Sequence, residues 1–315
     1  MDPLMYQAYL FVHFKEKETP DGEQVYFGLS QDGFHWEETN GGAPILTSAI
    51  GEQGVRDFTI LRKEDGTYCI LATDLSLARN FKTKYKGSWD EVGKNGSKSL
   101  ILWQSADLIH WSKPQAISFV DESFGCVWAP DIIRDEKTGE YIIHWSSSHS
   151  SNHYGPKKIY GTRTRDFEHF TPPFVLFERD EIGIIDSAMY QENGRYYLFV
   201  KSEANPETIM LLQSDSVTGP FTPIKAFSEE MKKLEQGQYE APTAFRMEDG
   251  RWCLLLDFYG TVKEKQGYIP FVSDDIHTGR FIRSDESFFF PYGFKHGTVL
   301  TLTNQEYERL KKAYL

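Results

Sequence analysis

A pattern that recurs five times along the chain constrains the fold more than any other feature. A Ser or Thr is followed within two residues by an Asp, and an aromatic residue follows a few positions later. The five copies cover residues 30–36, 105–111, 164–170, 214–221 and 273–281. Their closing aromatic residues are 75, 59, 51 and 60 positions apart. Recurrence at this spacing indicates repeated supersecondary units, and each copy is typical of a turn into an outer strand.

A second pattern interleaves with the first. In each unit a polar residue opens a short apolar strand, and a Gly-containing turn leads to an aromatic strand. The polar openers are Asp57, Asp131, Asp186, Glu240 and His296, at spacings of 74, 55, 54 and 56 residues. The tight turns between apolar strands predict hairpins after the first four openers, whereas no such hairpin follows the fifth.

These two patterns predict an all-β, five-bladed β-propeller that occupies residues 1–315 as a single domain. The fifth unit is cut short, and the strands expected at 8–14 and 25–30 lack an inner strand, so together they would make one complete blade. Such closure protects strand edges. Only 229–235 and 306–312 are expected to be helical, and a polar insertion at 82–98 explains the long first interval. The alternative architecture is a pair of β-sandwich domains.

Charge and hydropathy exclude several classes of partner. The chain has 34 Lys and Arg against 46 Asp and Glu, a net charge of −12, which disfavours nucleic acid and anionic membrane surfaces. No apolar run approaches the ~18 residues of a membrane span. We therefore expect a cytoplasmic protein, or a secreted one if a signal peptide precedes these residues. The three cysteines fit no metal or redox motif and are expected to be buried free thiols: Cys69, Cys126 and Cys253.

The inner strands of a propeller converge on its axis, so the polar openers would face one another across the channel. Taken singly, an Asp at a strand start is usually an ordinary solvated turn residue. Several carboxylates gathered in one channel raise the pKa of at least one of them. A protonated carboxyl group beside an ionised carboxylate is the pair that glycoside hydrolysis needs.

Motifs around these openers resemble glycoside hydrolase family 43, whose members are five-bladed propellers that cleave arabinofuranosides, xylosides and related sugars. The matching motifs are Val55-Arg56-Asp57, Val127-Trp128-Ala129-Pro130-Asp131, Ile185-Asp186-Ser187-Ala188, Tyr239-Glu240-Ala241-Pro242 and Lys295-His296-Gly297. The Ser-x-Asp-Leu-x-x-Trp motif at 105–111 is also typical of the family. Members that cleave galactan tend to lack the first-blade Asp, which is present here.

The resemblance implies a role for each of three carboxyl groups. Asp57 would be the general base that activates water, and Glu240 the general acid that protonates the departing oxygen. Asp186 would orient Glu240 and keep it protonated. The implied reaction is a single-step inversion of the anomeric centre. The chain departs from the usual pattern where Phe58 replaces Pro and Ala241 replaces Gly, which changes the shape of the pocket and not its carboxylates.

Further residues are expected to bind the substrate. Trp128 and Phe58 would form walls of the sugar pocket or else pack in the core, and Arg56 adjoins the base. Asp131 would contact the sugar or, alternatively, hold backbone amides at a strand start. His296 would bind ring hydroxyl groups, or would hold Ca²⁺ or another cation in the central channel. No cofactor is otherwise required.

The function expected from these features is that of an exo-acting α-L-arabinofuranosidase that acts on pentose-containing polysaccharide or oligosaccharide. The nearest alternatives are a β-xylosidase or an arabinanase on the same scaffold. A catalytically silent sugar-binding propeller and a protein-interaction propeller are alternatives from other classes. A lectin-like propeller would repeat one site in every blade, whereas the openers here differ.

Overall fold

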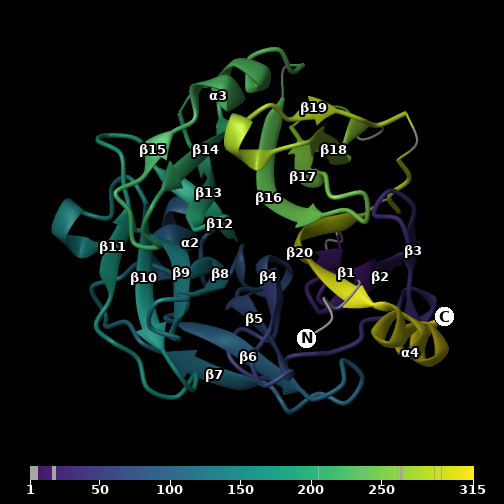
Figure 1. Cartoon of the computed structure of the whole chain (residues 1–315). Coiled ribbons are helices and arrows are strands. Elements are labelled where there is room, and N and C mark those ends of the chain that lie inside the picture. The colour runs from purple at the N-terminus through teal and green to yellow at the C-terminus, as the bar shows by residue number, and fades with distance from the viewer. Residues whose placement is uncertain are drawn as a thin grey trace.

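Five four-stranded antiparallel sheets surround a central axis, as Figure 1 shows. The computed structural model describes residues 6–15, 19–204, 206–235, 237–260, 262, 265–286, 288–291 and 293–315. Each sheet runs from an inner strand at the axis to an outer strand at the rim. The predicted five-bladed β-propeller is thereby confirmed.

Four blades are built from consecutive strands. The first is β4 (Val55–Arg62), β5 (Tyr68–Asp74), β6 (Ser99–Ser105) and β7 (Gln115–Ser118). The second is β8 (Trp128–Arg134), β9 (Tyr141–Ser147), β10 (Lys158–Thr164) and β11 (Phe174–Phe177). The third is β12 (Ile184–Glu192), β13 (Arg195–Ser202), β14 (Thr208–Ser214) and β15 (Thr222–Pro223). The fourth is β16 (Gln238–Arg246), β17 (Trp252–Tyr259), β18 (Gly267–Ser273) and β19 (Ile282–Arg283).

The fifth blade joins the two ends of the chain. Its inner strand is β20 (Phe294–Thr303), and the strands outside it are β1 (Tyr6–Lys15), β2 (Tyr26–Ser30) and β3 (Trp36–Glu38). Strand β1 pairs with β20 on one side and with β2 on the other. The predicted closure of the last blade by N-terminal strands is therefore correct.

The helices are short and lie outside the sheets. They are α1 (Leu77–Asn80), α2 (Trp89–Asn95), α3 (Lys225–Met231) and α4 (Asn304–Tyr314), with 3₁₀ turns at Asn40–Gly42, Ser150–Asn152 and Ile276–Thr278. Helix α4 contains the predicted 306–312, whereas α3 begins and ends earlier than the predicted 229–235. The polar insertion at 82–98 was not expected to be helical, yet it contains α2.

The repeated Ser/Thr-x-Asp pattern makes the same turn in successive blades. Ser30 Oγ accepts the Gly33 N–H at 2.9 Å, and Asp32 Oδ1 accepts two further backbone N–H groups at 2.8 Å. Ser105 and Asp107 repeat these contacts at 2.8–2.9 Å in the first blade. The side chains thus satisfy the backbone donors of a turn that carries the chain to the outer strand.

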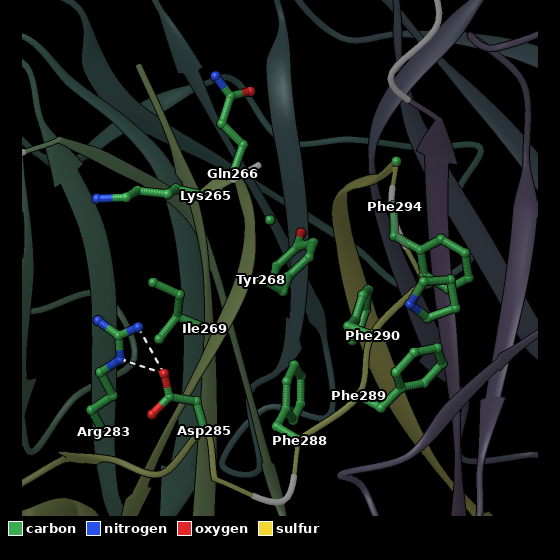
Figure 2. A pocket seen from close by; sticks show the side chains of 13 residues that line it. Lys265, Gln266, Tyr268, Ile269, Arg283, Asp285, Phe288, Phe289, Phe290 and Phe294 are labelled. Atoms are coloured by element: carbon green, nitrogen blue, oxygen red, sulfur yellow. Dashed lines mark hydrogen bonds and ion pairs between the residues drawn. The ribbon is translucent and has the colours of Figure 1, made fainter. Parts of the chain in front are cut away.

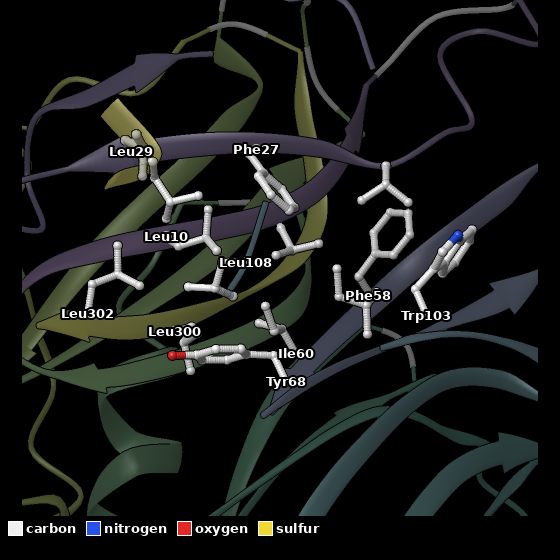
Figure 3. Packing of buried hydrophobic residues seen from close by; sticks show 14 of the residues in the cluster. Leu10, Phe27, Leu29, Phe58, Ile60, Tyr68, Trp103, Leu108, Leu300 and Leu302 are labelled. Atoms are coloured by element: carbon white, nitrogen blue, oxygen red, sulfur yellow. The ribbon is translucent and has the colours of Figure 1, made fainter. Parts of the chain in front are cut away.

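An apolar core joins the closing blade to the first blade. Figure 3 shows Leu10 and Phe27 of the closing blade packed with Leu300, next to Phe58 and Trp103 of the first blade. All of these side chains are buried. Hydrophobic burial of this interface therefore holds the ring closed.

Helix α4 adds a polar connection across the same interface. Its Glu306 completes a capping box with Thr303 and accepts an ion-paired hydrogen bond from Arg62 of β4 at 2.7 Å. Tyr68 of β5 also donates to Glu306. A charge-assisted pair that is largely buried anchors the helix more firmly than an exposed pair would.

A ring of hydrogen bonds joins all five inner strands near the axis. Its five contacts are Thr59 Oγ1 to Asp131 Oδ1 (2.9 Å), Met189 N to Asp131 Oδ2 (2.8 Å), Ala244 N to Tyr190 Oη (2.7 Å), Val299 N to Thr243 Oγ1 (3.1 Å) and Thr298 Oγ1 to the Phe58 carbonyl (2.7 Å). Every junction between neighbouring inner strands has one of these bonds. The ring therefore sets the relative height of the blades, and with it the positions of the residues at the mouth of the channel.

In the described ranges no helix is long and apolar enough to cross a membrane. The three cysteines are buried free thiols, as expected. Burial raises the pKa of Cys69 to about 12 and that of Cys126 to about 11, so these thiols stay protonated at neutral pH.

Candidate active site

Four inner strands bulge at one equivalent position close to their first residues. Pairing with the neighbouring strand shifts register at this point in β4, β8, β12 and β16. The residues at the bulges adopt left-handed backbone conformations, with φ of 52° at Asp57, 47° at Ala129, 53° at Asp186 and 53° at Ala241. In β20 the register shifts opposite His296 and Gly297.

The bulges correct the predicted register of the polar openers. Asp57, Asp186 and His296 occupy equivalent positions, as expected. Glu240 lies one residue before the equivalent Ala241, and Asp131 lies two residues after the equivalent Ala129. The interpretation of five openers in register is therefore wrong for two of them, because the residues that match by spacing lie on either side of a bulge.

Asp57 is paired with His296 across the junction between the first and last blades. The His296 Nδ1 lies 3.1 Å from Asp57 Oδ1, and both side chains are about 15 % exposed. Burial alone would raise the pKa of Asp57, but the His296 charge and the hydrogen bond to it outweigh burial and lower that pKa. Burial likewise opposes protonation of His296, but Asp57 and Asp186 raise its pKa to about 9. At neutral pH Asp57 is therefore an ionised carboxylate beside an imidazolium.

Asp186 has the opposite electrostatic character. Burial, reinforced by the negative charges of Glu240 and Asp57, raises its pKa to about 6 despite the nearby cations His296 and Lys201. Its backbone N–H donates to Ser146 Oγ at 3.0 Å, and its Oδ2 accepts the Ala241 N–H at 3.5 Å. Asp186 therefore lies between the second and fourth blades and contacts the strand that carries Glu240.

Glu240 is held by a lysine that the sequence analysis did not single out. Lys201 of β13 places its Nζ 3.3 Å from Glu240 Oε2, 3.0 Å from Glu207 and 2.6 Å from Tyr259 Oη. The Lys201 side chain is only 4 % exposed. Burial would lower the pKa of Lys201, but the charges of Glu240 and Asp186 raise it, so Lys201 remains a cation.

A second buried ion pair lies behind Glu240. Asp257 of β17 is the direct cross-strand partner of Glu240, and Lys295 Nζ lies 2.7 Å from its Oδ2. Burial, aided by the negative charge of Glu240, raises the pKa of Asp257 to about 6. The sequence signal for Asp257 was a lone acidic residue in the apolar run 252–259, and the signal for Lys201 was a lone lysine at the end of the apolar run 196–202.

Three of the residues that were predicted to contact the sugar have different surroundings in the structure. Trp128 is half-buried at the start of β8, with Lys157 Nζ 5.2 Å from the centroid of its ring. Arg56 is turned to Glu23 at 3.2 Å and to the Phe14 ring. Phe58 is only 2 % exposed and packs in the core between blades, which is the second of the two roles predicted for it. Its backbone follows the bulge directly, which turns its side chain into the blade interface.

Asp131 lies within the ring of hydrogen bonds described above. Its two oxygens accept from Thr59 and from the Met189 N–H, and His144 Nε2 lies 3.3 Å away. These contacts match the alternative in which Asp131 holds backbone amides. Among the described residues, no group of three or more His, Cys, Asp or Glu side chains converges to hold a metal ion. His296 faces Asp57.

Two cavities lie away from these carboxyl groups. Figure 2 shows one of about 320 Å³, where Tyr268 and Phe288, Phe289 and Phe290 line a space near the Arg283–Asp285 ion pair. The other, of about 500 Å³, is lined by Gln24, Gln53, Ser48 and Arg79 among others. Asp57, Asp186 and Glu240 line neither cavity, so neither is the site of the chemistry inferred here.

A propeller whose inner strands bring together an ionised aspartate, an aspartate with raised pKa and a glutamate has the groups that glycoside hydrolases use. Residues 4–308 match the glycoside hydrolase 43-related family, described as a probable glycosyl hydrolase domain. The chain belongs to this family. The matched family is one of glycosyl hydrolases, which cleave glycosidic bonds.

Individual relatives are distant. An α-L-arabinofuranosidase of Bifidobacterium longum subsp. longum is 24 % identical over an alignment of 237 positions, which covers 66 % of this chain and 22 % of that protein. The chain therefore spans about a fifth of the length of that relative.

Solved structures share the fold at low identity. A xylan β-1,4-xylosidase of Bacillus halodurans has a TM-score of 0.63 at 15 % identity and covers 96 % of this chain and 59 % of its own. An endo-arabinase of Bacteroides thetaiotaomicron has a TM-score of 0.53 at 15 % identity and covers 76 % of this chain and 84 % of its own. These likenesses concern the propeller fold alone.

Proposed function

We propose that the chain is an exo-acting, inverting α-L-arabinofuranosidase. The observation that carries the proposal is the contrast between Asp57 and Asp186. The pKa of Asp57 is lowered beside the His296 imidazolium, whereas that of Asp186 is raised to about 6. Carboxyl groups with opposed pKa shifts in one site are the arrangement that lets acid and base roles coexist at neutral pH.

In the proposed mechanism, Asp57 removes a proton from a water molecule, which attacks the anomeric carbon. His296 holds Asp57 in the ionised form that this step requires. Glu240 gives its proton to the glycosidic oxygen as the bond to the leaving sugar breaks. Lys201, itself bonded to Tyr259, holds the Glu240 carboxyl group, and Asp186 accepts the N–H of the next residue, Ala241.

The proposed substrate is a terminal arabinofuranose of a pentose-containing glycan. The name of the Bifidobacterium relative supports this choice. The second candidate is a β-xylosidase. The structural likeness to a xylan β-1,4-xylosidase, which extends over 96 % of this chain, supports it. Both pentoses present similar hydroxyl groups to the same channel.

Hydrolysis of an aryl pentoside panel by the pure protein tests the proposal. We expect the α-L-arabinofuranoside to be cleaved faster than the β-D-xyloside, and the D57A variant to be inactive on both. NMR should show the product first in the anomeric configuration opposite to that of the substrate. The reverse order of rates would select the xylosidase. Sugar binding without hydrolysis would identify a sugar-binding propeller, and a product with retained configuration would exclude inversion.

A further inference from the structure

The insertion in the first blade carries an exposed indole that contacts Trp128, the residue directly before the bulge of β8. We propose that Trp89 is a stacking platform for the sugar on the leaving side of the scissile bond. This inference rests on the proposed glycosidase function and deepens it, because it adds a second sugar-binding position to the site.

The insertion is rigidly anchored. Tyr85 and Val92 are fully buried, and Tyr85 Oη donates to Glu52. The Gly93 carbonyl accepts a hydrogen bond from Ser148 Oγ at 2.6 Å, which ties α2 to the second blade. Gly96 makes another such bond, from its N–H to the Gly125 carbonyl at 2.9 Å. The helix that carries Trp89 is therefore part of the framework of the propeller.

Trp89 nevertheless remains 54 % exposed. Its ring packs against Phe81 at a centroid distance of 5.6 Å, which supports one side of the indole. The indole is thus held on one side by Phe81 and left open to a ligand on the rest of its surface. Because folding already holds the Trp89 side chain in place, a ligand that stacks on it causes little further loss of side-chain entropy.

Trp89 lies next to Trp128, which connects it to the channel. Their ring centroids are 6.3 Å apart and the rings are almost perpendicular, at 85°. Trp128 opens the inner strand β8, whereas Trp89 comes from the insertion outside the inner strands. The two indoles are thus separated by about the length of one sugar ring. A sugar against Trp128 and the next sugar of the chain against Trp89 would occupy consecutive positions.

The chemistry of the two indoles fits this order. Pentose rings present C–H groups on one face, and a tryptophan ring offers a broad apolar face to such groups, while the sugar hydroxyls remain in water. Under exo action the terminal sugar occupies the channel, so the sugar that reaches Trp89 is the one released with the leaving group. The ligand class is therefore a neutral glycan at least two sugars long.

Comparison of two substrates that differ only in the leaving group tests the proposal. One is a pentosyl azide, whose small leaving group cannot reach Trp89, and the other is an oligosaccharide of the same pentose. The W89A variant should lower the ratio of kcat/KM for the oligosaccharide to that for the azide by about tenfold, and W89F should recover most of the loss. Phe289, which is 61 % exposed and lines the cavity of Figure 2, gives the matched control F289A, for which the ratio should not change.

The outcomes separate this inference from the proposed function. An unchanged ratio in W89A, or equal losses on both substrates, would overturn the platform. If the wild type cleaves neither substrate, the proposed function fails, and tryptophan fluorescence then decides on the platform alone. Quenching by the oligosaccharide in the wild type that W89F lacks would support a sugar platform, and its absence would overturn one.

Discussion

The first and third blades differ from the second and fourth at a single equivalent backbone position. All four inner strands bulge there into a left-handed conformation, yet the first and third carry Asp57 and Asp186, and the second and fourth carry Ala129 and Ala241. The left-handed region costs an L-residue about 1–2 kcal/mol, and Asp tolerates it better than Ala does. The backbone is thus the same in four blades, and side-chain identity alone decides which blades contribute a carboxylate at the bulge.

The side chains of the site therefore differ between blades, although the backbones of the four inner strands have the same bulge. The two aspartates lie near the same cation, His296, but only Asp57 pairs directly with it, and their pKa values move in opposite directions. The acidic groups of the other two blades lie off the bulge position. Asp131 joins strands, whereas Glu240 contacts Lys201.

The largest expected effect comes from replacing Asp57 by alanine, the residue that the second blade has at the equivalent bulge. The D57A variant should lower kcat/KM by about 10²–10⁴ on every substrate, because the attack by water always needs the base. The A129G variant, altered at the same bulge of the second blade, should stay within a few-fold of the wild type. Comparable losses in both variants would show that the bulge, and not the carboxylate, matters.

Glu240 lies one residue before the bulge of the fourth blade, and its loss should depend on the leaving group. The E240Q variant should lower kcat about 10²-fold or more with a sugar leaving group, and only slightly with a dinitrophenolate, which departs without protonation. Steady-state rates on the two substrates measure this. Equal losses would remove the acid role from Glu240 and pass it to Asp186 or Asp131.

Asp131 lies two residues after the bulge of the second blade, and its loss should act on stability. The D131A variant leaves the Thr59 hydroxyl and the Met189 N–H without their acceptor, which should lower the free energy of unfolding by about 2–4 kcal/mol. Urea titration measures this. The T59V variant removes only one of the two bonds and should cost less. A stable D131A protein that binds sugar weakly would instead make Asp131 a substrate ligand.

Asp186 distinguishes the third blade by its pKa, so its effect should depend on pH. With a pKa of about 6, Asp186 is charged only above that pH. The D186N variant should therefore match the wild type below about pH 5 and fall about tenfold behind it at neutral pH, since the charge that favours a protonated acid is missing. Profiles of kcat/KM against pH test this, and a constant ratio across the range would exclude a role through charge.

The smallest effect concerns the backbone itself. Ala241 has φ of 53°, where glycine is unstrained. The A241G variant should raise the free energy of unfolding by roughly 0.5 kcal/mol, because relief of strain exceeds the extra chain entropy of glycine. Thermal unfolding checks this. A decrease would show that the Ala241 methyl group makes contacts worth more than the strain.

The two repeated patterns together were sufficient to predict the five blades, because each outer turn needs the same side chains in every blade. It was harder to predict which polar residues occupy equivalent positions on the inner strands. Spacing matched Asp131 and Glu240 to Asp57, since a bulge adds a residue without leaving any mark in hydrophobic periodicity. Lys201 and Asp257 were missed because they come from middle strands, β13 and β17, outside the recurring pattern of openers. The sequence left two roles open for Phe58 and for Asp131, because the direction of a side chain after a bulge follows from local dihedral angles.

The pairing of β1 with β20 also has a consequence for the order of events during synthesis. At translation rates of about 5–20 residues per second, β1 leaves the ribosome on the order of half a minute before its partner. Through that interval an apolar strand has one unpaired edge, which neighbouring nascent chains can join. His296, the partner of Asp57, arrives on the same late strand. The Asp57–His296 pair therefore forms only when the ring closes. A polypeptide released before β20 is made would lack this pair and would expose the edge of β1 to aggregation.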